Sequence, residues 1–547
     1  MKNMRYLLLA GSMLAAGGAA VSAQESIPVV EIVYSNNSVD YIPTSEISSI
    51  SHMWSLETDN PHFATVQSLF DKMKEIGETH REIGYPAIML ATDLQTADMY
   101  SKNNSYNWFS GWQEYNLNPD YVYNYAIWKY LYSYIRIAND IVKALQSPAD
   151  DEENLYLAQA LAMRSFSYWN LVQLFAHNFH FAPDADAIPL VTETNNEAAF
   201  AGTPVAMSTT RGVYDLILSD IDKAIELLKN KNIDAALLDI DNAQRYINLG
   251  VAYGLRARYN LTMHRYAEAA ADARLAIEST GARPMVAALA GLTGFNDAKA
   301  SNWMWGITVN ESDDAALQWV GCYASHISSV SNGYATNTEV SKCCGSALWN
   351  YLSQHPQDVR RNWFVDNVAE ATALIPAEIR ALRSALGSLP HTNIKFGVYG
   401  RNPERIFAAE DIPLMRVEEM YLIEAEGMAM SGNTAQGREL LNAFVQKYRN
   451  PAYNCTATDK EDIQNEVLWQ RRLEFWGEGL AYFDMVRLQR DLDRCDPVLD
   501  TMFKLRIRGG SDHFLYKKSE KYIPKIQGFT TPEYVQPVAG NEGIWND

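Results

Sequence analysis

Apolar residues recur at helical spacing along much of the chain. They are three or four residues apart between Trp128 and Val142, and the pattern repeats from Leu155 to Phe175. This spacing places apolar side chains on one face of an α-helix. The turn residues 148–151 separate the two predicted helices. A further helix is predicted from Val213 to Leu228, with Ser208 to Arg211 as its N-cap region.

The next helices alternate small and large residues. A helix is predicted from Asn242 to Met263, and with the segment from Tyr266 to Ile277 it resembles a tetratricopeptide helix pair. A second such pair runs from Met420 to Phe444. The two earlier long helices and the helices from Ile463 to Leu488 supply candidates for two more. Such pairs bury a core by stacking on neighbours, so the pattern predicts a mainly α scaffold of about four helix pairs.

The helical period is lost between residues 280 and 410, where glycine, serine, asparagine and many aromatic residues gather. Within this stretch, Trp303 and Trp305 alternate with other residues and precede Ile307, which favours a buried strand. A second aromatic, turn-rich stretch runs from Tyr100 to Trp112. Long loops in a compact protein are often functional, and so many tryptophans argue against disorder.

No linker rich in proline, glycine and serine divides the chain. We therefore expect a single domain over 24–547. It comprises an N-terminal helical part (24–279), an irregular aromatic-rich insertion (280–410) and a C-terminal helical part (411–547).

The composition adds limits on compartment and partner. The chain has 547 residues, of which 47% are hydrophobic, and a formal net charge of −20. This acidity argues against a nucleic-acid partner, because phosphate binding requires a basic surface. At the N-terminus, basic Lys2 and Arg5 precede an apolar run, and small residues end at Ala23. The segment 1–23 is a predicted signal peptide, so we expect an exported protein.

The five cysteines are too few for a disulfide scaffold and lack the spacing of a zinc site. They are expected to be buried thiols, with Cys455 and Cys495 as candidates for a disulfide. His177 and His180 lie three residues apart but have no cysteine or carboxylate cluster nearby. Neither a metal nor a cofactor is therefore predicted. Sequence motifs of common catalytic sites are also absent, so no catalytic residue is assigned.

Charges and aromatics crowd into residues 470–479, which contain Arg471, Arg472, Glu474 and Glu478. These four charged residues fall at helical spacings, where side chains meet. An ion-paired seam that closes the last helices onto a core is the favoured interpretation. A catalytic carboxylate pair is the alternative.

The same stretch resembles the C-terminal signature of the SusD/RagB family of outer-membrane nutrient-binding proteins. Further blocks resemble that family in the expected order, and they are residues 128–139, 158–174, 187–191, 210–224, 358–360, 395–396 and 416–426. Three features depart from the family pattern. Gln470 stands where the family usually has Glu, Ala481 stands where it often has Arg, and no lipobox cysteine occurs before Cys322. Attachment through an N-terminal lipid is therefore left open.

The resemblance implies a non-enzymatic function at the outer face of the outer membrane. Proteins of this family act as lids on SusC-like, TonB-dependent barrels and deliver oligosaccharides, or in some members peptides. Sugar binding needs flat apolar faces with polar groups at the rim, and aromatic side chains in polar loops supply these faces. The candidate ligand-binding residues are Trp108, Trp112, Trp319 and Tyr323. For each of them, the alternative role is to anchor its loop to the scaffold.

Two other classes of protein stay open. An exported all-helical glycoside hydrolase would use loop tryptophans and two carboxylates, although nothing in the chain singles out a pair. A repeat scaffold that only docks other proteins would leave the tryptophans without a ligand.

Overall fold

The computed structural model describes residues 29–33, 39–43, 60–77, 79–80, 82–101, 122–239, 241–286, 295–310, 313, 322–330, 333–336, 340–375, 377, 389–397, 410–499 and 506–507. Contacts divide the chain into two units, residues 1–55 and 56–547. In the smaller unit, strand β1 (Val29–Val33) pairs antiparallel with β2 (Val39–Pro43). The predicted signal peptide lies outside the described residues.

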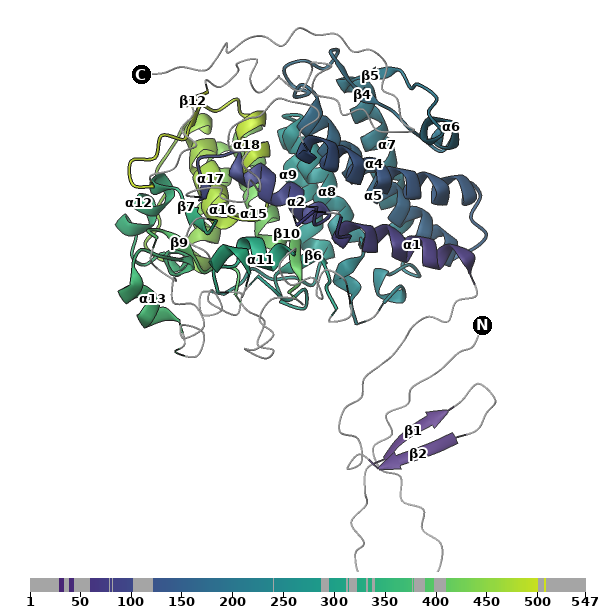
Figure 1. Ribbon diagram of the computed structural model, residues 1–547, viewed down its shortest axis with the longest axis horizontal. Coiled ribbons are helices and arrows are strands. Elements are labelled where there is room, and N and C mark those ends of the chain that lie inside the picture. Colours follow the sequence, from purple (N-terminus) through teal and green to yellow (C-terminus); the bar gives the residue numbers. More distant parts are fainter. Residues whose placement is uncertain are drawn as a thin grey trace, which may run out of the picture. The chain divides into compact units, whose positions relative to one another are not determined.

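The larger unit is mainly α-helical (Figure 1). Neighbouring helices pack in succession: α5 contacts α4 and α7, α8 contacts α9, α9 contacts α15, and α15 contacts α16 and α17. The N-terminal and C-terminal helical parts therefore meet where α9 packs on α15. The bounds of the helices are α1 (Pro61–Asp71), α2 (Tyr85–Leu94), α4 (Val122–Ala144), α5 (Asp151–Phe175), α6 (Asn196–Phe200), α7 (Thr210–Leu228), α8 (Leu249–Thr262), α9 (Tyr266–Ser279), α11 (Tyr323–Ile327), α12 (Ser346–Gln354), α13 (Val368–Leu374), α15 (Val417–Met430), α16 (Thr434–Tyr448), α17 (Lys460–Glu474) and α18 (Ala481–Arg487).

The N-cap region predicted for α7 is confirmed, and α5 begins with a cap of the same kind. The side chain of Asp150 accepts a hydrogen bond from the backbone N–H of Glu153, 2.9 Å away, at the start of α5. At α7, the hydroxyl of Thr209 accepts one from the N–H of Gly212, at 3.1 Å. Both bonds satisfy a backbone donor that has no partner within the helix, which is why short polar side chains begin helices. The helix predicted from Asn242 is wrong at its start, because α8 is capped by Asn248 and begins at Leu249.

Helix α5 is buried on every side from Leu155 onward, so its polar residues need partners inside the protein. The guanidinium of Arg164 donates to both carboxylate oxygens of Asp220 on α7, each at 2.7 Å. A third bond, of 2.6 Å, joins Arg164 to Glu193. The central helix is thereby tied to its neighbour by charge as well as by apolar packing.

The irregular stretch between α9 and α15 contains short helices and strands. Strand β6 (Trp303–Ile307) pairs antiparallel with β10 (Ile412–Arg416), and both strands are fully buried. The prediction of a buried strand at Trp303 and Trp305 is confirmed. A four-stranded sheet has the order β3 (Met99–Ser101), β7 (Lys342–Cys344), β9 (Thr392–Asn393) and β8 (Phe364–Val365). Strand β4 (Asp186–Pro189) pairs with β5 (Met207–Thr209), and β11 (Leu492–Asp493) with β12 (Arg506–Ile507).

Glycines allow the C-terminal helices to cross closely. A Cβ atom added at Gly427 on α15 would lie 2.5 Å from the carbonyl oxygen of Tyr266 and 2.8 Å from the Cβ of Ala270. Both of these residues belong to α9. At Gly437 on α16, an added Cβ would lie 2.6 Å from the carbonyl oxygen of Ala425 on α15. The small residues of the predicted helix pairs therefore stand at real helix crossings.

None of the five cysteines is in a disulfide, so the candidate disulfide between Cys455 and Cys495 is not formed. Burial raises the pKa of Cys322 and Cys343 to about 12, which keeps both thiols protonated and unreactive. Within the described part of the chain, no helix has the length and apolar character needed to cross a bilayer.

Candidate functional site

The charged seam predicted in residues 470–479 is an ion-pair network in the core. Glu474 is fully buried and lies at the end of α17, where three arginines surround it. Its carboxylate accepts hydrogen bonds from Arg449 at 2.6 and 2.7 Å and from Arg416 at 2.9 Å. Arg360 lies 3.6 Å away.

Glu478 completes the network one turn beyond the helix. It accepts bonds of 2.7 and 2.8 Å from Arg416 and one of 2.6 Å from the ammonium group of Lys395. Lys395 also donates to the backbone carbonyls of Glu474 and Trp476, at 2.9 and 2.7 Å. The network thus fixes the Gly477 and Gly479 turn, where both glycines adopt positive φ (81° and 75°).

The electrostatics of the seam favour a structural role. Burial alone would raise the pKa of Glu474, but Arg449, Arg416 and Arg360 together hold it well below its ordinary value. A carboxylate held ionised by three guanidinium groups is a poor general acid. The favoured interpretation, an ion-paired seam, is confirmed.

Gln470, the departure from the family pattern in this seam, is also fully bonded. Its side-chain oxygen accepts from Arg360 at 2.6 Å, and its amide donates to the hydroxyl of Tyr351 at 3.0 Å. Because Arg360 already pairs with Asp358 at 2.7 Å, an uncharged partner is sufficient at this position.

Of the four candidate ligand-binding residues, one is described by the structure. Tyr323 begins α11 and is 5% exposed. Its hydroxyl donates to the carbonyl oxygen of Gly477 at 2.7 Å, and its ring packs edge-on against Phe396 with centroids 6.0 Å apart. These contacts anchor α11 to the Gly477 turn and to Phe396. Trp108, Trp112 and Trp319 lie outside the described residues.

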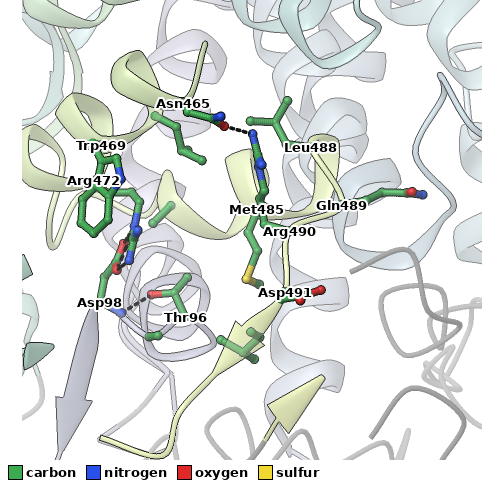
Figure 2. Close-up of a pocket in the computed structure, with 14 residues that line it drawn as sticks. Thr96, Asp98, Asn465, Trp469, Arg472, Met485, Leu488, Gln489, Arg490 and Asp491 are labelled. Carbon is green, nitrogen blue, oxygen red and sulfur yellow. Dashed lines mark hydrogen bonds and ion pairs between the residues drawn. The ribbon is translucent and has the colours of Figure 1, made fainter. Parts of the chain in front are cut away.

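A groove of about 660 Å³ opens beside the seam, between α17 and α18 (Figure 2). Its walls come from segments far apart in the sequence: residues 96–98 after α2, one face of α17, α18, and the segment that follows α18. Helix α17 supplies Asn465, Leu468, Trp469 and Arg472, at the three- and four-residue spacing of a single helix face. Helix α18 supplies Ala481, Met485 and Leu488 from its first residue to its C-cap.

One wall of the groove carries a flat aromatic ring and a neutralised ion pair. Arg472 donates to both oxygens of Asp98, at 2.5 to 3.1 Å. The guanidinium of Arg472 also lies 4.5 Å from the centre of the Trp469 ring, within the range of a cation–π contact. Trp469 stacks with Tyr351 at a centroid distance of 5.8 Å and an interplanar angle of 13°. The indole is half-buried and held in place by both neighbours.

Arg490, which follows α18, also lines the groove. Figure 2 shows its guanidinium between Asn465 and Leu488, and it donates a hydrogen bond to the side-chain oxygen of Asn465. The chain reverses at Gln489, a non-glycine residue with a left-handed φ of 47°, which directs residue 490 back over the helix. Among the described residues, no carboxylate forms an ion pair with Arg490, and its buried Nε has no acceptor.

Sequence analysis did not single out the groove. The spacing of Asn465, Trp469 and Arg472 on one helix face was the available signal. Asp98, the partner of Arg472 in the groove, is 374 positions away. The spacing of residues within one helix does not predict a contact with a segment so distant in the sequence.

The histidines considered for a metal site have other contacts. His180 stacks on His264 with ring centroids 4.1 Å apart, and the Nε2 atom of His264 bonds the carbonyl oxygen of Arg487. Across the described ranges, no cluster of three or more histidine, cysteine or acidic side chains could hold a metal ion.

Comparison with known proteins gives matches to family models at both ends of the chain. A SusD-like model described as starch-binding and associating with the outer membrane matches residues 55–238, and a SusD family model matches residues 376–540. A curated relative, a SusD-like protein from Formosa agariphila, is 22% identical over 415 residues, covering 70% of this chain and 76% of that protein.

Solved structures share the fold. A SusD-like carbohydrate-binding protein from Bacteroides vulgatus superposes with a TM-score of 0.68 at 19% identity, covering 86% of this chain and 99% of that chain. A laminarin-binding SusD-like protein gives a TM-score of 0.57 at 19% identity, with 78% and 90% covered. Surface glycan-binding protein A from Bacteroides thetaiotaomicron, in complex with laminarihexaose, gives 0.58 at 18% identity, with 87% and 94% covered. The prediction of a mainly α, SusD-like fold is confirmed.

Proposed function

Because the chain belongs to the SusD/RagB family, we propose that it is a cell-surface subunit that binds oligosaccharides at the outer membrane. In this proposal it acts as the lid of a SusC-like, TonB-dependent barrel and passes its ligand to the barrel.

The observation that carries the proposal is the match of both ends of the chain to SusD family models. The model for residues 55–238 is described as starch-binding and associating with the outer membrane. Two proteins of the same fold are named for binding laminarin or laminarihexaose. Shared fold alone does not assign a ligand, so the glycan class is left to the experiment.

The groove supports a binding function over a catalytic one. It combines a flat indole with amide, guanidinium and carboxylate groups, which is the composition expected where sugar hydroxyls are bound. Its inner carboxylate, Asp98, is held by the paired bonds from Arg472. Both oxygens of Asp98 are thus engaged by Arg472, an arrangement that favours a structural role over the acid–base chemistry of glycoside hydrolysis.

The test is calorimetric titration of the mature chain, residues 24–547, with plant, host and microbial oligosaccharides. Binding of one glycan class, with no new reducing ends after incubation, is the expected result. Binding of peptides, with no binding of any glycan, would show that the ligand is a peptide, as in the peptide-binding members of the family. Release of reducing ends would contradict the proposal in favour of a hydrolase.

The loop tryptophans are proposed to supply the sugar-stacking faces. Trp108→Ala and Trp319→Ala should each weaken glycan affinity by at least about 1 kcal/mol, the scale of a specific aromatic contact. Tyr323→Phe is the matched control: its hydroxyl anchors α11 to Gly477, so affinity should be unchanged while the melting temperature falls. Unchanged affinity in both tryptophan variants would remove these residues from the site.

The partner is tested separately from the ligand. Purification of the tagged full-length protein from its native outer membrane should recover a TonB-dependent barrel in near-equal amount. Recovery of the protein alone, under detergent conditions that preserve other outer-membrane complexes, would contradict the lid function and leave glycan binding intact.

A further inference from the structure

We propose that the groove between α17 and α18 binds an acidic sugar residue, with the carboxylate or sulfate of that sugar on Arg490. The inference rests on the proposed glycan-binding function and names the chemical class of one ligand unit.

The groove carries a positive charge that suits an acidic ligand. Its inner wall is neutral, because Asp98 and Arg472 form a bidentate pair. The other two charged groups that line it are Arg490, which is half-buried, and Asp491, which is exposed. Figure 2 shows the side chain of Asp491 turned away from Trp469 and Arg472. An exposed carboxylate is screened by water and salt, so the interior of the groove keeps a net positive charge.

Arg490 differs from the arginines around it because no described carboxylate forms an ion pair with it. Arg487 pairs with Glu426 at 2.6 Å and with Asp484 at 2.8 Å, and Arg472 pairs with Asp98. Among its described neighbours, the guanidinium of Arg490 donates only to the neutral amide oxygen of Asn465. The chain has 66 acidic and 46 basic residues, so carboxylate partners are plentiful elsewhere. A half-buried guanidinium without one has donors available for an anion.

The environment of Arg490 favours the binding of an anionic group. Burial and the neighbouring Arg487 lower the pKa of Arg490, and nearby Glu426 offsets this only in part. A guanidinium binds a carboxylate or a sulfate through two parallel hydrogen bonds, and such charge-assisted bonds are about twice as strong as neutral ones.

The shape of the groove also suits a sugar unit. A volume of about 660 Å³ falls within the usual range of small-ligand sites. Apolar Leu468, Met485 and Leu488 also line the groove, where a pyranose ring could place its C–H groups. Ala481 also borders the groove, and its methyl group leaves free the space that a longer side chain would occupy.

The experiment is a titration of the mature chain with three probes: oligogalacturonate, sulfated galactan oligosaccharides and neutral laminarin oligosaccharides. Arg490→Gln removes the charge and leaves a shorter, polar amide side chain. It should weaken binding of the acidic probe at least about tenfold. Arg136 is exposed on α4, so Arg136→Gln controls for the loss of one positive charge and should change affinity less than about twofold.

A second variant tests the space independently of the charge. Ala481→Met fills the groove without adding charge and should abolish acidic-probe binding. Thermal unfolding of each variant verifies that it is folded. If the chain prefers oligogalacturonate, the group bound by Arg490 is a carboxylate. If it prefers the sulfated probe, that group is a sulfate ester.

The remaining outcomes separate this inference from the proposed function. Acidic-probe binding that survives both variants overturns the inference. Binding of laminarin alone overturns it as well, while leaving glycan binding in place. Absence of binding to all three probes and to the wider glycan panel overturns both.

Discussion

Glu474 illustrates how single residues hold this protein together. It is an acid with no exposed surface, yet it is ionised because three arginines converge on it. Moving the charges of such a cluster into the core is costly, and their mutual attraction offsets this cost only while every partner is present. The cluster is therefore more sensitive to the loss of one member than a surface ion pair.

Glu474→Gln should lower the free energy of unfolding by roughly 3–5 kcal/mol, the usual cost of breaking a buried pair. Urea denaturation would measure the change. The control is Glu226→Gln, which removes an exposed carboxylate paired with Lys223 and should cost less than about 1 kcal/mol. Equal effects in the two variants would show that the seam does not stabilise the fold.

Asp93 has the opposite electrostatic situation. Burial raises its pKa to about 8, and the N–H of Gly479, at 3.1 Å from Oδ2, offsets this only in part. The folded chain therefore keeps a proton on Asp93 that the unfolded chain releases above its ordinary pKa of about 4. The resulting contribution to stability is present at low pH and is lost as the pH rises from about 4 to about 8.

Asp93→Asn should remove this pH dependence. Relative to the wild type, the variant should gain at least about 2 kcal/mol of stability between pH 5 and pH 8, because its side chain stays neutral throughout. Paired denaturation curves at the two pH values measure the gain. A constant difference between variant and wild type would show that Asp93 is ionised in the folded chain.

Among the elements, the contact between α9, α15 and α16 depends most on residue size. Gly427 and Gly437 stand where the backbone of one helix touches its neighbour. Helices at such short separation gain dispersion contacts along their length, but leave no room for an added methyl group.

Gly427→Ala should destabilise the protein by roughly 1–3 kcal/mol through overpacking, although alanine is the better helix former. Gly281→Ala is the control, since an added Cβ there meets nothing within 4 Å. Differential scanning fluorimetry compares the two variants. A melting temperature for Gly427→Ala at or above that of the wild type would show that the helices can separate at no cost.

Much of the element scale could be predicted from the sequence, and the exceptions have physical reasons. The helices at 128–142, 155–175 and 213–228 follow from local apolar periodicity, and their caps follow from short polar side chains. The start of α8 was placed too early because the polar run after Asn242 forms a short 3₁₀ turn, Ala243–Arg245, before the cap at Asn248. The groove was not predicted, since its walls meet only through tertiary contacts.

At the scale of the whole molecule, contacts between distant segments join the helical parts of 56–547. Arg258 on α8 donates to Glu419 on α15 at 2.5 Å, a pair 161 positions apart. Arg494 reaches the carbonyl oxygen of Leu94 at 2.7 Å, across 400 positions. Both arginines are buried, so neither part can keep its charges satisfied without the other.

Calorimetry of the mature chain should therefore show one cooperative transition for residues 56–547, with equal calorimetric and van't Hoff enthalpies. The segments 55–238 and 376–540, expressed alone, should lack the near-ultraviolet circular dichroism of packed aromatic rings. Two separate transitions would show that the helical parts are independent domains.

The tie between α2 and the last helices also bears on the order of events during synthesis. Asp98 leaves the ribosome early, whereas its partner Arg472 follows 374 residues later. At about 5–20 residues per second, the delay is roughly 20–75 s. During that interval, the face of α2 that packs on α18 is uncovered. This part of the molecule thus matures only after translation is nearly complete.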